Sequence, residues 1–105
     1  MKVVLLPKAL SRLEEIFEWI KSTNSENSAV KVYNSILDEL EVLEKHPKIA
    51  AIEPILEDLP KQFRSLIINR KYKAIYYIEE QNDTVFIATI WDCRQNTINL
   101  PKEIY

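Results

Sequence analysis

The chain contains no glycine, only one cysteine and no long apolar run. A chain without glycine cannot form the Gly-rich loop that cradles phosphates in many nucleotide-binding proteins. The single cysteine, Cys93, permits neither an internal disulfide nor a metal site built from several thiolates, and it fits a reducing compartment. No spaced set of His, Cys or acidic residues indicates a metal. We therefore expect no cofactor.

The apolar runs are too short for a membrane protein. None approaches the roughly 18 residues that a membrane-spanning helix needs. The run Val3–Leu6 ends at Pro7 and is also too short for the apolar core of a signal peptide. We expect a cytoplasmic protein that does not associate with a membrane.

The composition is that of a small globular protein. The 105 residues, of which 47% are hydrophobic and 29% charged, predict a single domain over residues 1–105 with one sheet covered by helices. The formal net charge is −2, so no overall positive field attracts nucleic acid. The charge is uneven, because residues 1–60 are acidic on balance and residues 61–105 are basic. The second part is therefore where we look for function.

The first part predicts a short strand and then a helix. Lys2–Leu6 suits a strand, and Pro7 ends it because proline cannot continue a ladder of backbone hydrogen bonds. Apolar residues then recur at steps of three and four, which indicates a helix with one face toward a core: Leu10, Leu13, Ile16, Phe17 and Ile20.

A second amphipathic helix follows a polar break. We expect it to be capped near Ser25, whose hydroxyl can accept a hydrogen bond from a free amide of the first turn, and to run to about Glu44 or Lys45. It must stop near His46, because proline follows and disfavours the helical conformation there. Residues 47–60 show no apolar period, and we expect an irregular loop packed against the core.

The remaining chain predicts a three-stranded antiparallel meander. Phe63–Ile68 and Tyr72–Ile78 are rich in aromatic and β-branched residues, and a third strand starts near Val85. Polar turns at 69–71 and 81–83 separate them. Asn and Asp tolerate the left-handed backbone of tight turns, for which this chain has no glycine.

The register of the last hairpin depends on its turn. If Asn82 and Asp83 form a two-residue turn, Ile78 pairs with Ile87. Because side chains alternate along a strand, one face then gathers charged residues. These are Lys73, Asp92 and Arg94, joined by Arg64 if the first turn also has two residues. A three-residue first turn moves Arg64 to the other face.

The same register places three large aromatic residues together. Phe63, Tyr76 and Trp91 share the face opposite the charged side chains, and we interpret them as core. Tyr77 lies on the face of Lys73, where we favour packing over stacking on a nucleic-acid base.

The whole pattern resembles a known superfamily. The predicted elements, the loop HPKIAAIEP, the stretch FRSLIINRKYKAIYYIE and a last strand ending in WDCRQN are similar to the RelE/ParE superfamily of toxins from bacterial type II toxin-antitoxin systems. The resemblance covers nearly the whole chain and is most specific at Arg64, Tyr72, Lys73, Tyr76 and Arg94. It implies an α+β fold of order β-α-α-β-β-β, with a helical hairpin packed on one face of an antiparallel sheet.

The resemblance also implies a function. Members of the superfamily arrest growth, some by cutting mRNA on the ribosome and others by poisoning DNA gyrase, and a cognate antitoxin neutralises them. In the nucleases, positions that match Arg64, Lys73 and Arg94 surround the scissile phosphate, and these three are the catalytic candidates here. Cations suit that place because guanidinium groups stabilise the charge that develops on the phosphate.

Three functions remain open. The nucleases usually place a Tyr or His just after the last strand, where this chain has Gln95, Asn96, Thr97 and Ile98, so enzymatic activity is undecided. The alternatives are a gyrase inhibitor and a catalytically inactive protein-binding domain. Each candidate cation also has a structural interpretation as one half of an ion pair, and Asp92 could serve only to orient Arg94.

Overall fold

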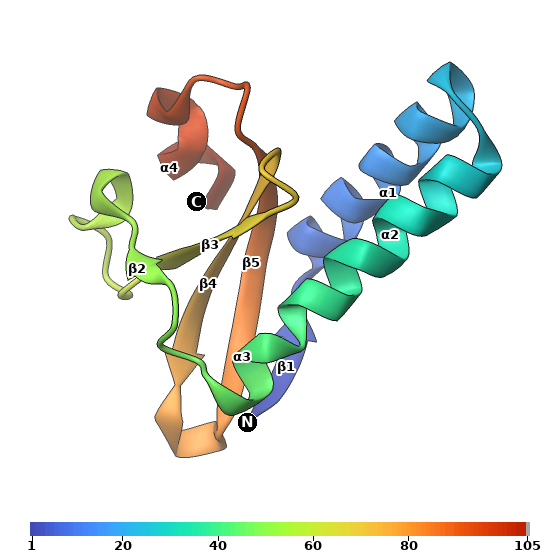
Figure 1. Cartoon of the computed structure of the whole chain (residues 1–105). Coiled ribbons are helices and arrows are strands. Elements are labelled where there is room, and N and C mark those ends of the chain that lie inside the picture. Colours follow the sequence, from blue (N-terminus) through green and yellow to red (C-terminus); the bar gives the residue numbers. More distant parts are fainter. Residues whose placement is uncertain (105) are drawn as a thin grey trace.

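The computed structural model describes residues 1–104, and Figure 1 shows its architecture. Five strands form one sheet in the order β1-β5-β4-β3-β2. Helices α1 (Pro7–Thr23) and α2 (Glu26–Leu40) form a hairpin on one side of the sheet, and the short helix α4 (Leu100–Ile104) lies on the other (Figure 1). Within these residues, no helix combines the length and apolar character that crossing a membrane requires. The α+β fold with a helical hairpin on one face is confirmed.

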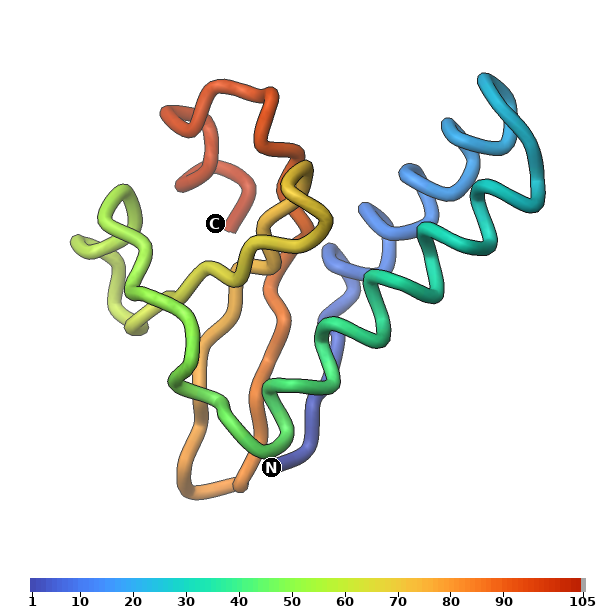
Figure 2. Tube along the Cα trace, viewed as in Figure 1, coloured from blue at the N-terminus to red at the C-terminus, as the bar shows by residue number. Residues whose placement is uncertain are grey.

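The sheet is antiparallel except at one edge. Its strands are β1 (Lys2–Leu5), β2 (Ala51–Ile52), β3 (Arg64–Ile68), β4 (Tyr72–Glu79) and β5 (Thr84–Asp92). β1 pairs with β5 in parallel, and the helical hairpin and the loop after it connect β1 to the antiparallel strands. The N-terminal and C-terminal strands of the chain are therefore direct neighbours, as the trace in Figure 2 shows.

The predicted second helix is present but divided. Ser25 is its cap, and the Ser25 hydroxyl accepts a hydrogen bond from the backbone N–H of Ser28 at 3.0 Å. The helix breaks at Glu41 and continues as α3 (Val42–Lys45). The helical run ends at Lys45, before His46, as the following proline predicts.

The expectation of an irregular loop over residues 47–60 was wrong at two points. β2 lies within this segment and pairs with the start of β3, and the backbone N–H of Glu53 donates to the carbonyl of Phe63 at 2.9 Å. A 3₁₀ turn (Pro54–Leu56) follows it. A two-residue strand is too short to produce a detectable apolar period. Nearer the C-terminus, another 3₁₀ turn (Thr97–Asn99) leads into α4, and the sequence predicted neither of them.

The predicted register of the β4–β5 hairpin was wrong. Ile78 pairs with Val85 instead of Ile87, because residues 80–83 rather than two residues connect the strands. This connection contains the 3₁₀ turn Glu80–Asn82 and then Asp83 in the left-handed conformation, with φ 50°. A short polar side chain takes the role that glycine would take elsewhere.

A β-bulge also interrupts this hairpin. Tyr76 pairs with Ile87, but the next residue, Ile75, pairs with Thr89, so Ala88 has no partner on β4. Because one extra residue on β5 breaks the alternation, every side chain of β5 beyond the bulge changes faces relative to a regular ladder. This shift decides where the charged end of β5 points.

The sheet separates two apolar cores. The larger lies under the helical hairpin, where Tyr76 packs with residues such as Leu13 and Ile36. The smaller lies under α4 and the 3₁₀ turn after β2, and its buried members are Leu56, Phe63, Ile75, Trp91 and Leu100. Phe63, Tyr76 and Trp91 are all buried, but the expectation that they share one face was wrong, because only Tyr76 faces the helices.

Candidate functional site

Arg94 follows the end of β5 and is held by Asp92, the last residue of that strand. The backbone N–H of Arg94 donates to Asp92 Oδ1 at 2.9 Å, and its Nη2 donates to Oδ2 at 2.7 Å. The guanidinium carbon lies 5.9 Å from the ring centroid of Trp19 on α1. The Arg94 side chain is nevertheless 67% exposed. A carboxylate therefore orients a guanidinium that faces solvent, which confirms the orienting role considered for Asp92.

The ionisation of this pair is shifted by mutual contact. The side-chain hydrogen bond from Arg94 lowers the pKa of Asp92, and burial opposes it only in part. The same hydrogen bond raises the pKa of Arg94. Burial raises the pKa of Tyr72, which pairs with Asp92 across the two strands, and the Asp92 charge adds to the effect. Near neutral pH the Asp92 side chain is thus an ionised carboxylate. Its lowered pKa makes it a poor acceptor of a proton, and therefore a poor general base.

A pocket of about 310 Å³ lies beside this pair, between α1, the ends of β4 and β5, and α4. Arg12 and Glu103 line it, and Arg12 donates from Nε and Nη2 to both carboxylate oxygens of Glu103 at 2.9 to 3.2 Å. The Glu103 side chain is 5% exposed, and Lys8 approaches it at 3.6 Å. The hydrogen bonds of Arg12 to Glu103, and secondly to Glu15, raise the pKa of Arg12. The contact with Glu103 also attaches α4 to α1. The charged groups of this pocket are therefore largely paired with one another.

Lys73 lies in the middle of the meander and points away from the helices. Its Nζ donates to Glu53 Oε1 at 2.8 Å. The two side chains are 21% and 6% exposed, so the pair is mostly withdrawn from water. It joins β4 to the segment between β2 and the following 3₁₀ turn, next to the smaller core. The ammonium group is thus engaged inside the protein.

Arg64 is the first residue of β3, and its surroundings differ from those of Arg94 and Lys73. It pairs with Tyr76, so its side chain starts on the face toward the helices, and its Nη1 donates to the carbonyl of Ala50 at 2.7 Å. Within residues 1–104 it forms no salt bridge. It lines a second pocket of about 230 Å³ together with Lys48 and Lys61.

The structure does not bring the three candidate cations together. Lys73 pairs with Trp91 and faces away from Asp92, because the bulge at Ala88 reverses the alternation between them. Arg64 lies on the same face as Asp92, because the first turn has three residues. The two residues are nevertheless apart along the sheet. Arg64 pairs with Tyr76, whereas Asp92 pairs with Tyr72 at the far end of β4. The expectation of one charged face was therefore wrong. The catalytic role of Arg64, Lys73 and Arg94 stays a prediction.

Several residues at these sites were not singled out from the sequence. Trp19 and Arg12 come from α1, about 70 residues before the end of β5, and no local pattern connects the two segments. For Trp19 the sequence did hold a clue, because this large aromatic residue falls outside the apolar stripe of its helix. In the structure its side chain is 57% exposed. Lys48 lies in residues 47–60, which were expected to be irregular, and Lys61 directly follows them; neither position belongs to a predicted strand whose side chains could be assigned to a face.

Comparison with known proteins identifies the family. The sequence matches, over residues 3–97, the family described as ParE toxin of type II toxin-antitoxin system, parDE. The chain belongs to the ParE toxin family. This finding places the protein within the superfamily that the sequence resembles. No curated protein matches the chain.

Two solved structures share the fold of this ParE-family chain. One is described as the chromosomal ParDE TA system from P. aeruginosa; it is 19% identical, with a TM-score of 0.73, and the match covers 88% of this chain and 95% of that one. The other is the isolated E. coli RelE toxin, which is 16% identical with a TM-score of 0.57, and the match covers 96% and 93%. At these identities the likeness shows the fold alone.

Proposed function

We propose that this ParE-family protein is a growth-arresting toxin that acts by binding DNA gyrase. The dispersal of the three candidate cations supports this choice. Cleavage of RNA by its own 2′-hydroxyl requires charged groups fixed around one phosphate. Lys73 is bound to Glu53 on one face of the sheet, whereas Arg64 and Arg94 lie on the other face at separate ends. A toxin that works by surface contact does not need them to converge.

Cleavage of ribosome-bound mRNA is the second candidate. The exposed guanidinium of Arg94, fixed by Asp92, is the observation that favours it, because an oriented cation suits a phosphate. In that case Arg64, Lys73 and Arg94 form the catalytic set, and Lys73 must leave Glu53 when RNA binds. The need to break a mostly buried ion pair counts against this candidate.

A cognate antitoxin is the expected partner of either kind of toxin. Large apolar side chains on the helical hairpin remain open to solvent, among them Leu10 and Trp19 on α1 and Val30 on α2. A peptide that covers this hairpin and the adjoining sheet would bury on the order of 2,000 Å² in a permanent complex. We propose that neutralisation works through such a cover, which also hides Arg94 because Arg94 lies over Trp19.

Induction of the protein alone in a bacterial host tests the proposal. Newly made DNA and newly made protein are labelled separately at short intervals after induction. The gyrase mechanism predicts that DNA synthesis falls first and that a DNA-damage response appears while translation continues. Co-expression of the gene next to this one, if it encodes the antitoxin, should restore growth.

The other outcomes decide between the alternatives. Translation that stops first supports cleavage of mRNA and contradicts the gyrase proposal. Unimpaired growth with confirmed expression of folded protein contradicts both toxin mechanisms in that host and supports a catalytically inactive protein-binding domain.

A further inference from the structure

Positive charge gathers where the segment before β3 meets the β4–β5 hairpin. The pocket of about 230 Å³ at this place is lined by three cations, Lys48, Lys61 and Arg64, and by two carboxylates, Glu79 and Glu80. The pocket is therefore positive on balance in a chain whose formal net charge is −2. We propose that this pocket binds a phosphate group, supplied by a nucleotide or by a nucleic-acid backbone.

The donors of this pocket are largely available. Arg64 uses Nη1 for the Ala50 carbonyl, a neutral acceptor, and within residues 1–104 it has no carboxylate partner. Lys61 Nζ lies 4.6 Å from the ring centroid of Tyr77 and forms no salt bridge in the same part of the chain. Lys48 Nζ is 3.4 Å from Glu80, but both side chains are more than half exposed. Exposed pairs of this kind are weak and open readily.

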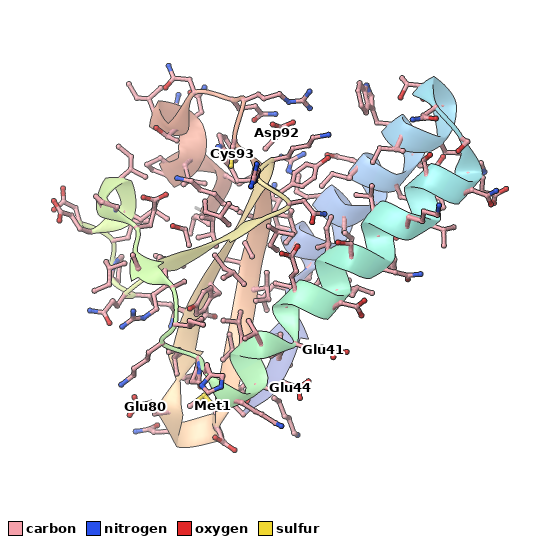
Figure 3. All side chains as sticks on the ribbon, in the orientation of Figure 1. Met1, Glu41, Glu44, Glu80, Asp92 and Cys93 are labelled. Carbon is pink, nitrogen blue, oxygen red and sulfur yellow. The ribbon has the colours of Figure 1, made fainter. Side chains whose placement is uncertain are left out.

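The other pocket, beside Arg94, suits an anion less well than this one. There Arg12 and Arg94 face three carboxylates, those of Glu15, Asp92 and Glu103, so the balance is negative. Both guanidinium groups already form close hydrogen bonds to carboxylate oxygens. A phosphate that entered would have to displace carboxylates and would meet like charge. Figure 3 shows Asp92 and Glu80 at opposite ends of the sheet, so the two pockets are separate places.

The chemistry of the lining fits a phosphate. A guanidinium presents parallel N–H donors that match two phosphate oxygens, and ammonium groups add charge without strict geometry. Arg64 starts a strand and is half-buried, which fixes its position better than that of the two lysines. The Glu79 carboxylate accepts a hydrogen bond from the side-chain amide of Asn82, so one of its oxygens already has a partner. Glu80 competes with the ligand for Lys48, and we therefore expect modest affinity, with a Kd of about 1 mM for free phosphate.

This inference does not depend on the gyrase proposal. The test uses the purified full chain, prepared by cell-free synthesis, without antitoxin or gyrase. Three ligands are titrated in low-salt buffer: inorganic phosphate, a mononucleotide and a single-stranded oligonucleotide of about twelve nucleotides. Binding is followed by NMR at the Arg64 Nε and at backbone amides of the pocket. The expected result is a saturable shift at these positions.

Variants locate the site. Lys61→Gln and Arg64→Gln should each weaken phosphate binding about fivefold to tenfold, because each removes one charge-assisted contact. Glu80→Gln should strengthen it about twofold, because it frees Lys48 and removes repulsion. Lys31→Gln removes an exposed charge on α2, away from the pocket, and should change nothing. Since Arg64 also holds the Ala50 carbonyl, Lys61→Gln keeps the test valid if Arg64→Gln fails to fold.

The three ligands distinguish the source of the phosphate. An oligonucleotide that binds far more tightly than the other two, with a steep dependence on salt, identifies a nucleic-acid backbone. A mononucleotide that binds more tightly than inorganic phosphate and at least as tightly as the oligonucleotide identifies a free nucleotide. Equal binding of all three ligands identifies the phosphate group alone. The proposal is overturned if no ligand gives a saturable shift in the pocket, or if Lys31→Gln weakens binding as much as Lys61→Gln.

Discussion

At the scale of single residues, the contact between Asp92, Arg94 and Trp19 is the most informative. Two segments that are distant in sequence, α1 and the end of β5, meet there, and the guanidinium stays open to solvent. An arginine that is oriented without being buried suits recognition of a partner better than it suits stabilisation of the fold. A substitution of Arg94 should therefore impair contact with the target without impairing folding.

Arg94→Ala should relieve growth arrest without unfolding the protein. The Arg94 side chain is mostly exposed and that of Asp92 is partly buried. Because the guanidinium faces solvent, we expect the melting temperature to stay within about 2 °C of that of the parent. Colony formation after induction and thermal unfolding measure the two effects. Lys31→Ala, which removes another exposed charge, is the matched control and should remain toxic. A large fall in melting temperature would show that the ion pair is structural.

Asp92 provides a prediction for pH. The pKa of Asp92 is lowered in the folded state, chiefly by the hydrogen bond from Arg94. A lowered folded-state pKa contributes stability above the unfolded-state value, and this contribution is lost as the pH falls through the folded-state value. An NMR titration of the Asp92 carboxyl should therefore show a midpoint below the usual aspartate value, and Arg94→Ala should move it upward. An unchanged midpoint would mean that the two side chains do not interact in solution.

At the scale of elements, the order and type of the main segments were readable from the sequence, but the faces of the meander were not. Apolar periods of three and four predicted the helices, and Ser25 and the proline after His46 predicted where the second one begins and ends. The bulge at Ala88 carries no sequence signal, because alanine at this position would fit a regular strand equally well. Strict alternation therefore put Trp91 and Asp92, which lie beyond the bulge on β5, on the wrong faces relative to Lys73. The contacts of Lys73 with Glu53 and of Arg94 with Trp19 join segments that are distant in sequence. The spacing of apolar residues and the propensity of residues for helix or strand describe only local structure, so they cannot predict such contacts.

The turn between β3 and β4 shows how a chain without glycine makes a tight connection. Asn69 and Arg70 both have positive φ, 52° and 61°. Asn accepts this conformation readily, but arginine does so at a cost of roughly 1 kcal/mol. Arg70→Gly should therefore stabilise the protein by about 0.5 to 1 kcal/mol, measured by urea unfolding. Asn69→Val, which puts a β-branched residue at positive φ, should destabilise it, and the opposite order of the two variants would contradict the turn geometry.

The pair of Lys73 and Glu53 should behave as part of the fold. Lys73→Met leaves the mostly buried Glu53 carboxylate without its partner and should lower the free energy of unfolding by about 3 kcal/mol. The double variant Glu53→Leu/Lys73→Met should recover most of this loss. Lys71→Met, at an exposed neighbouring position, is the control and should stay within about 0.5 kcal/mol. Loss of toxicity in Lys73→Met at unchanged stability would instead favour a catalytic lysine.

At the scale of the whole molecule, the sheet divides the protein into two sides with different character. The helical hairpin covers the larger core and leaves apolar side chains open to a partner, whereas α4 covers the smaller core with Leu100 and Ile104. The contact of Glu103 with Arg12 attaches α4 to α1. The candidate cations are spread over both sides and both ends of the sheet. This distribution suits a small protein that meets large partners over its surface.

A supercoiling assay with purified components tests whether this ParE-family protein acts on gyrase, as we propose. Gyrase, relaxed plasmid and ATP are incubated with increasing amounts of the protein, and a parallel translation extract receives the same amounts. If the protein inhibits gyrase, supercoiling should fall as the protein is added, the Arg94→Ala variant should leave supercoiling largely intact, and the mRNA in the extract should stay whole. Undiminished supercoiling together with cleaved mRNA on the ribosome would show that gyrase is not the target.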